Sequence, residues 1–282
     1  MNVGLGLPIS DPLSLLSWAR RADAGPFTTL GLLDRLVYAN PEPLVTLAAI
    51  AGATSRIRVQ TEVLLGPLRQ SALLAKQTAT LDRVSGGRFT LGVGIGTRQD
   101  DYLAAGADVR RRGRRLDRQL TTLRRVWSGE PYSEEVGPIG PAPVQDGGPE
   151  ILIGAFAPAA LERVARWGDG YLCAAPVALA DRLMRDVERF WTEAGRDGRP
   201  RMVAQVNVAL GPESTVQDAK ETITSYYGFL GDTTRVVENM LTTPERIRDA
   251  ITAFTDLGAD EVILYCWARD ADQIDRLADV AV

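Results

Sequence analysis

Short apolar runs alternate with longer segments of helical spacing along almost the whole sequence, and this alternation limits the possible fold more than any other feature. We expect strands at residues 2–7, 27–33, 57–63, 89–93, 150–153, 170–174, 202–210 and 261–266. Most of these runs are continuously apolar, which is typical of parallel strands that are buried on both faces. Each run is followed by helical sequence, and nothing marks a reversal of strand order. The pattern therefore predicts a closed (β/α)8 TIM barrel rather than an open doubly wound sheet.

The length of the chain fits one barrel. Because a barrel of this class takes about 250 residues, we interpret residues 1–282 as a single domain. The first helix is expected to have Pro12 in its first turn and Ser10 as its cap. Residues 128–149, which include the run GPIGPAP, are too rich in glycine and proline to form a barrel element. They are predicted to be a surface excursion inserted before the fifth strand.

The composition removes several classes of function. The sequence has no histidine and two cysteines, Cys173 and Cys266, which excludes Ser–His–Asp and Cys–His catalysis and leaves no histidine or thiolate metal site. A net charge of −4 argues against a nucleic-acid partner, and no segment approaches the roughly 20 apolar residues of a membrane span. The absence of a signal-peptide pattern and of a disulfide framework makes the cytoplasm the expected location. The chemistry is expected to come mostly from a bound cofactor, or else from carboxylates and hydroxyls.

In such a barrel, function resides where the strands end and the following loops begin. The residues expected at that rim are Asp34, Thr61, Glu62, Gly94, Gly96, Thr97, Gly154, Ala155, Phe156 and Ala157. The glycines at alternate positions 92, 94 and 96 match neither a dinucleotide fingerprint nor a P-loop. They leave bare backbone that a flat ring or another backbone approaches closely.

Three features of the rim each have a structural and a functional interpretation. Residues 154–157 lie between a strand and a helix, where free amides favour a phosphate, but an ordinary strand-to-helix turn has the same composition. Glu62 is either a contact of a cofactor or ligand, or the partner of Arg35 or Arg69 in an ion pair. The run RRRGRR at 110–115 is either a solvated loop neutralised by nearby aspartates at 100, 101 and 108, or a site for an anionic cofactor tail.

Three blocks of sequence also carry a family resemblance. Residues 56–96 are RIRVQTEVLLGPLRQSALLAKQTATLDRVSGGRFTLGVGIG, residues 112–127 are RGRRLDRQLTTLRRVW, and residues 149–172 are PEILIGAFAPAALERVARWGDGYL. These blocks, in this order, closely resemble the bacterial luciferase-like flavin- and deazaflavin-dependent oxidoreductases. After Pro200 the likeness is confined to the order of strands and helices.

The resemblance implies a luciferase-like TIM barrel with insertion segments and an isoalloxazine-type ring at the carboxyl ends of its strands. It implies that Asp34 touches the polar edge of the ring, and that residues 61–63 support the ring face through a non-proline cis peptide or a bulge. It also implies that residues 94–97 line the ring and that residues 154–157 hold a phosphate through backbone amides.

Two departures from the family bear on the reaction. Family members that oxidise sugar phosphates or alcohols carry a histidine where this chain has Arg35 and a glutamate where it has Thr97. A base that takes a hydroxyl proton is therefore missing at both places. Reduction of an electron-poor C=C or C=N bond of a small organic substrate fits better, because the hydride comes from the cofactor. Tyr102, Glu62 or solvent is then the expected source of the proton.

The deazaflavin coenzyme F420 is the expected cofactor, because the alanine- and arginine-rich composition suggests a high-GC organism. A luciferase-like monooxygenase that uses FMN, O2 and a separate reductase is the alternative. A barrel that binds a flavin without catalysis is a second alternative. The resemblance further implies a homodimer paired through helices on one side.

Overall fold

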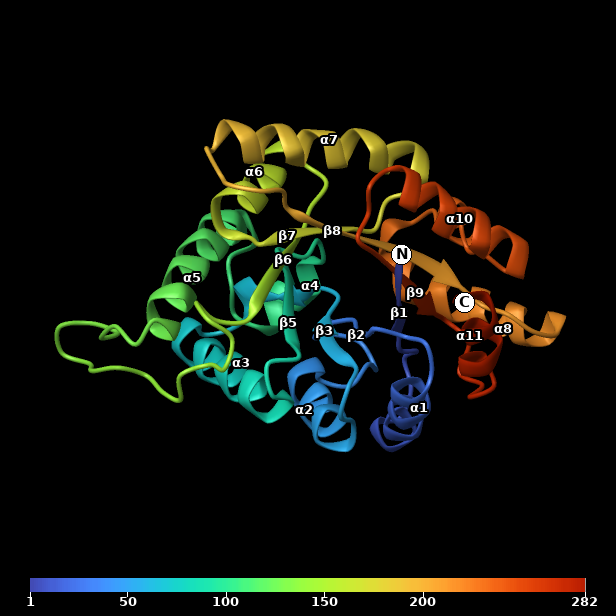
Figure 1. Ribbon diagram of the computed structural model, residues 1–282, viewed down its shortest axis with the longest axis horizontal. Coiled ribbons are helices and arrows are strands. Elements are labelled where there is room, and N and C mark those ends of the chain that lie inside the picture. Colours follow the sequence, from blue (N-terminus) through green and yellow to red (C-terminus); the bar gives the residue numbers. More distant parts are fainter. Residues whose placement is uncertain (282) are drawn as a thin grey trace.

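The computed structural model describes residues 1–281, in which parallel strands close into a barrel inside a ring of helices (Figure 1). The strands are β1 (Asn2–Gly6), β2 (Thr29–Leu32), β3 (Arg58–Thr61), β4 (Leu64–Leu65), β5 (Phe89–Gly94), β6 (Glu150–Gly154), β7 (Gly170–Cys173), β8 (Arg201–Val208) and β9 (Glu261–Cys266). Their order is β3-β2-β1-β9-β8-β7-β6-β5, and a pairing of β3 with β5 closes the ring. The short β4 pairs with the end of β5. The predicted (β/α)8 barrel is confirmed.

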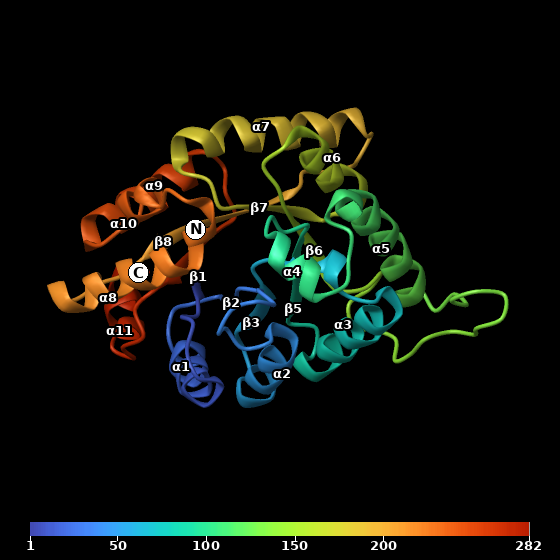
Figure 2. The same ribbon diagram turned by 180° about the vertical axis from the view of Figure 1, so that it is seen from behind.

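The helices fall into two groups. The outer ring consists of α1 (Pro12–Ala24), α2 (Pro43–Ala53), α3 (Ser71–Ser85), α5 (Arg112–Trp127), α6 (Pro158–Trp167), α7 (Val177–Glu193), α10 (Pro244–Asp256) and α11 (Gln273–Ala281). The insertions after β5 and β8 contribute α4 (Gln99–Ala104), α8 (Glu213–Tyr227) and α9 (Thr234–Glu238), and 3-10 turns occur at η1 (Gly66–Leu68), η2 (Val109–Arg111) and η3 (Gly228–Leu230). In both views α4 lies within the outline of the ring (Figures 1 and 2).

Local sequence signals explain where the first helices begin. Asp11 caps α1, because its Oδ1 accepts a hydrogen bond from the Leu13 amide at 2.8 Å. The prediction that Ser10 is the cap is wrong, since the Ser10 hydroxyl pairs with that of Ser14 at 2.9 Å. Glu42 caps α2 in a similar way, through the Val45 amide at 2.7 Å.

The third predicted strand, 57–63, is interrupted. The β3 ladder ends at Thr61, and the peptide bond between Glu62 and Val63 is cis before β4 begins. The cis peptide implied by the family resemblance is thus confirmed. Just before the interruption the Thr61 carbonyl lies against β5, where a Cβ on Gly92 would be 1.9 Å from the carbonyl oxygen. Only glycine fits at that position without a shift of the backbone.

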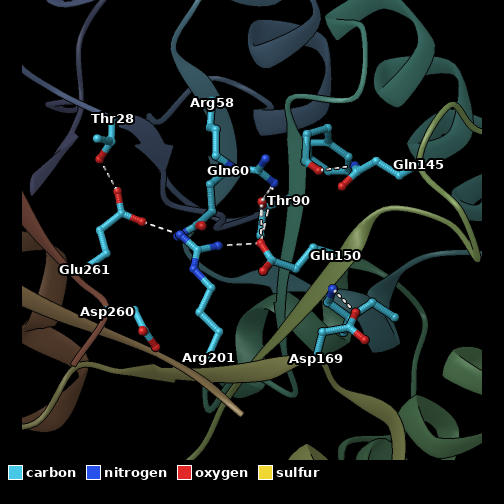
Figure 3. Close-up of polar contacts among 12 residues, drawn as sticks. Thr28, Arg58, Gln60, Thr90, Gln145, Glu150, Asp169, Arg201, Asp260 and Glu261 are labelled. Atoms are coloured by element: carbon cyan, nitrogen blue, oxygen red, sulfur yellow. Dashed lines mark hydrogen bonds and ion pairs between the residues drawn. The ribbon is translucent and has the colours of Figure 1, made fainter. Parts of the chain in front are cut away.

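The barrel interior has an apolar layer above a polar one. Leu152, Leu172, Val203 and Ile263 form the apolar layer, and Val63 packs on it. The polar layer is made by the first residues of several strands (Figure 3). There Arg201 bridges Glu150 and Glu261 at 2.5 Å each, and Arg58 joins the same network through Thr90. Because these charges pair with one another at the amino ends of the strands, this end of the barrel is closed by its own side chains.

Residues 128–149 extend from the barrel beside α5 as a largely exposed loop, the long green segment in Figure 1. Asp82 of α3 anchors its base by accepting hydrogen bonds from the amides of Val144 at 2.6 Å and Gln145 at 2.9 Å. The Gln145 side chain also donates to the Phe89 carbonyl at 2.7 Å. In the described part of the chain, no helix is both long enough and apolar enough to cross a membrane.

Candidate cofactor site at the carboxyl end of the barrel

Four segments that are distant in sequence meet at the carboxyl end of the barrel because their strands are parallel neighbours. They are the turn after β2 with Asp34, the Glu62–Val63 link between β3 and β4, the end of β5 with residues 94–97, and the end of β6 with residues 154–157. The rim residues predicted from the sequence are therefore on the same end of the molecule. Their individual environments differ.

Val63 lies between two of the predicted glycines. A Cβ on Gly94 would lie 2.8 Å from Val63 Cγ2, and a Cβ on Gly154 would lie 2.7 Å from Val63 Cγ1. Both glycines are thus needed so that the half-buried Val63 side chain fits over the apolar layer of the barrel. Val63, rather than a side chain at either glycine, therefore fills this part of the rim.

The remaining residues of this part of the rim have packing or surface positions. Thr61 is fully buried, and its hydroxyl donates to the Gly92 carbonyl at 2.7 Å. Gly96 has a φ of +66°, and a Cβ there would lie 2.9 Å from a methyl of Leu65. Thr97 is exposed just before α4. Thr61 therefore joins two strands, while Thr97 is open to the solvent side of the rim.

Asp34 is a buried carboxylate with one engaged oxygen. Its Oδ2 accepts hydrogen bonds from the Leu65 amide and from Arg69 Nη2, each at 2.8 Å. Burial raises the pKa of Asp34 above its usual value, and the nearby Arg69 guanidinium opposes this change. Among residues 1–281, no side chain donates a hydrogen bond to the other oxygen of Asp34, Oδ1. The polar edge of a bound ring is a suitable partner for that oxygen.

Glu62 is a buried carboxyl group without a cationic partner in the described structure. Its Oε1 accepts a hydrogen bond from Gln60 Nε2 at 3.0 Å, while Oε2 is buried and has no hydrogen bond among residues 1–281. The carboxyl group lies against Gly31, where a Cβ would be 2.2 Å from it. Burial raises the pKa of Glu62 to about 8. A pKa raised in this way favours the neutral, protonated form of the group at neutral pH.

The ion pairs considered for Glu62 are made by other residues. Arg69 pairs with Asp34, and Arg35 lies with its Nε 3.3 Å from Asp101 Oδ2. Arg35 also donates to the Tyr226 carbonyl at 3.1 Å and lies 5.6 Å from the Phe229 ring centre. It thus ties the turn after β2 to α4 and to the end of α8. Sequence reasoning missed this pair, and no local spacing marks residues 35 and 101 as partners.

The aspartates near the arginine run have separate roles. Asp108 lies 3.5 Å from Arg110 and 3.6 Å from Arg111. Asp101 instead pairs with Arg35, and Asp100 pairs with Arg98. The interpretation that three aspartates neutralise the run is therefore correct for Asp108 alone.

The turn at 154–157 leads directly into α6. The Ala155 carbonyl accepts a hydrogen bond from the Tyr171 hydroxyl at 2.8 Å, which fixes the turn. Helix α6 begins after Ala157 without a side-chain cap, and Phe156 is 58% exposed. An uncapped helix start with small neighbouring residues leaves amide donors for an anion. The residues present therefore fit a phosphate here.

Taken with the fold, these features define a (β/α)8 barrel protein with a candidate cofactor site at the carboxyl ends of its strands. Comparison with known proteins makes the assignment specific. The family model described as luciferase-like monooxygenase matches residues 4–281. The chain belongs to the luciferase-like monooxygenase family.

Curated relatives match part of the chain. An uncharacterized protein of Mycobacterium tuberculosis is 34% identical over 170 residues, which is 58% of this chain and 60% of that protein. The F420-dependent glucose-6-phosphate dehydrogenase of Nocardia farcinica is 28% identical over 197 residues, which is 64% of this chain and 58% of that enzyme. The matched part of the chain thus spans about three fifths of the length of these relatives.

Solved structures match the whole barrel. The monooxygenase RslO1 of Streptomyces bottropensis superposes with a TM-score of 0.82 at 22% identity, covering 99% of this chain and 97% of that one. An F420-dependent secondary alcohol dehydrogenase, solved with an F420-acetone adduct, gives a TM-score of 0.83 at 18% identity with the same coverage, 99% and 97%. At these identities the likeness establishes the fold.

Proposed function

We propose that this protein is an oxidoreductase that transfers a hydride from the reduced form of the deazaflavin coenzyme F420 to a small organic substrate and so reduces a C=C or C=N bond, with the coenzyme left oxidised. Membership of the luciferase-like family supports a redox function. The similarity to an F420-dependent dehydrogenase of Nocardia farcinica supports the choice of coenzyme. The observation that carries the direction of the reaction is the buried carboxyl group of Glu62, which has an unpartnered Oε2 among residues 1–281 and a pKa that burial raises to about 8.

The coenzyme, when bound, supplies the hydride, and the protein holds and orients it. Asp34 Oδ1 is the candidate acceptor for the polar edge of the ring, and the Val63 side chain is the candidate support for its face. The amides at the start of α6 are the candidate phosphate donors. These assignments agree with the positions that the family resemblance implies.

A reduction needs a proton, and Glu62 Oε2 is a place to hold it. Tyr102 is a less suitable source, because its buried hydroxyl donates to the Ile95 carbonyl and burial raises its pKa to about 12. Oxidation of an alcohol would need a base instead. The sequence has no histidine, and the residue beside Asp34 is Arg35, which is paired with Asp101. The polar groups of this rim therefore favour protonating a product over deprotonating a substrate.

The second candidate is an FMN-dependent monooxygenase that uses O2 and receives reduced flavin from a reductase. The name of the family model favours it. A reduced flavin reacts readily with oxygen and a reduced deazaflavin hardly does, so the choice of cofactor decides between the two reactions. The homodimer, the cytoplasmic location and the reductase partner remain predictions.

Hydride transfer with pre-reduced F420 and a panel of unsaturated acceptors tests the proposal. We expect single-turnover oxidation of the coenzyme with at least one acceptor, and a loss of roughly a hundredfold in that rate for Glu62→Gln. Oxygen consumption with reduced FMN, and no reaction with F420, would favour the monooxygenase. A cofactor that binds but never turns over with any acceptor or with oxygen would favour a non-catalytic barrel.

A further inference from the structure

Two residues of the arginine run, Arg111 and Arg114, line a groove that the proposed reaction does not use. Arg111, Arg114, Asp117 and Arg118 line a cavity of about 460 Å³ along the first turns of α5. We call this cavity the α5 groove. Its carboxylate is already engaged, because Asp117 Oδ1 lies 2.6 Å from Arg163 Nε. Arg114 and Arg118 have no carboxylate within 4 Å in the described part of the chain, so the groove carries uncompensated positive charge.

The placement of these charges is unfavourable for the helix itself. The first turn of α5 contains no acidic residue and begins at Arg112, followed by Arg114 and Arg115. Cations near a helix amino end oppose the helix dipole. Arg114 and Arg118 are four residues apart on one face, a spacing at which like charges repel. An anion bound in the groove offsets both effects.

The α5 groove lies beside the candidate phosphate site. Helices α5 and α6 are neighbours in both views (Figures 1 and 2). Arg163, on the second turn of α6, contacts Asp117 of α5, and its guanidinium occupies the space where a Cβ on Gly113 would lie. The first turns of the two helices are therefore at about the same level. Since α6 follows directly from the 154–157 turn, a phosphate held there would lie close to the first turns of both helices, within reach of a flexible anionic chain attached to it.

We infer that the α5 groove binds a flexible chain of carboxylates, which is the chemistry of the anionic tail of F420. This inference rests on the proposed function for the source of the ligand, although a free polycarboxylate offers the same groups. The consequence is a preference for coenzyme forms with long tails. A groove of exposed guanidiniums binds through charge, so the preference should weaken as salt is added.

The test is a fluorescence titration with F420 carrying several glutamates and with F420 that keeps its phosphate but carries none. We expect the wild-type protein to bind the long-tailed form roughly tenfold more tightly at low salt. The double variant Arg114→Gln, Arg118→Gln should lose this preference to within about twofold. Arg20→Gln, an exposed arginine of α1, is the matched control and should keep it. Thermal unfolding of the double variant should be unchanged or shifted upward, because a repulsive pair is removed.

Equal binding of both coenzyme forms to the wild-type protein would overturn the inference and leave the F420 proposal intact. Binding of neither form would overturn the proposed function. In that case a calorimetric titration with free oligo-γ-glutamate tests, independently of the coenzyme, whether the α5 groove binds carboxylates. Binding that the double variant loses would support a carboxylate site, and no binding would overturn it.

Discussion

Replacing Glu62 by glutamine should change how the stability of the protein depends on pH. The carboxyl group is buried beside Gln60 with Oε2 unpartnered, and its pKa rises from the usual 4.5 to about 8 in the folded chain. In the unfolded chain the group titrates near its usual value. Between these two values the folded protein keeps a proton that the unfolded chain has lost. The free energy of unfolding therefore falls as pH rises through this window.

The size of the effect follows from the change in proton affinity. Each pKa unit corresponds to 1.36 kcal/mol, so the stabilisation present below pH 4.5 that is lost by about pH 8 is on the order of 5 kcal/mol. This is a large share of the 5–15 kcal/mol that stabilises a typical protein. Glutamine is a neutral group of the same shape, so Glu62→Gln should match the wild-type protein near pH 5 and exceed its stability by several kcal/mol near pH 8.

Urea unfolding of the cofactor-free protein at several pH values measures this difference. Tryptophan fluorescence and far-ultraviolet circular dichroism should give coincident transitions, which checks that a single free energy is being measured. Glu134→Gln, in the exposed loop at 128–149, is the control and should follow the wild-type curve. A difference between Glu62→Gln and wild type that stays constant from pH 5 to pH 8 would refute the picture of Glu62 as a buried acid.

Three further substitutions test other parts of the structure. Gly92→Ala should destabilise the protein by about 3 kcal/mol or more in urea unfolding, because its Cβ would meet a backbone oxygen at 1.9 Å. The control Gly52→Ala, in open space on α2, should instead stabilise the protein by about 1 kcal/mol. Equal effects of the two substitutions would contradict the close contact between Gly92 and the Thr61 carbonyl. Ala157→Asp should raise the melting temperature by capping α6, yet weaken coenzyme binding about tenfold. Ala157→Ser should raise the melting temperature without weakening binding. Unchanged titration curves for the aspartate variant would show that this turn does not bind the phosphate. Asp34→Ala should cost about 1–3 kcal/mol of stability as well as affinity, since it removes the acceptor of Arg69 Nη2 and of the buried Leu65 amide, although Arg69 keeps its ion pair with Glu42. A loss of affinity with stability unchanged would show that these bonds are unimportant for folding.

The fold was largely predictable because it depends on a repeated pattern. Continuous apolar runs followed by helical spacing occur along the whole chain, so an error in one element does not change the architecture. Boundaries were less predictable. Asp11 rather than Ser10 caps α1, since both residue types favour that position and only the chain geometry selects one. The break at Glu62 was expected from the family resemblance alone.

The sequence predicts the place of the candidate site in the barrel better than it predicts the side-chain contacts within the site. Parallel strands bring Asp34, Glu62 and Gly154 to one rim, which the sequence pattern indicates. It does not indicate that Val63 fills the space beside two glycines, or that Arg35 pairs with Asp101. These contacts join residues from different strands and loops. They depend on side-chain packing across the rim, for which no local spacing gives a signal.

The most direct test of the central proposal is a fluorescence titration of the purified protein with F420 and, separately, with FMN. The proposal predicts saturable, tight binding of F420 and much weaker binding of FMN. Ala157→Asp should weaken the F420 curve, and Ala157→Ser should not. Tight binding of FMN with little or no binding of F420 would contradict the proposal and would make the FMN-dependent monooxygenase the better account of this site.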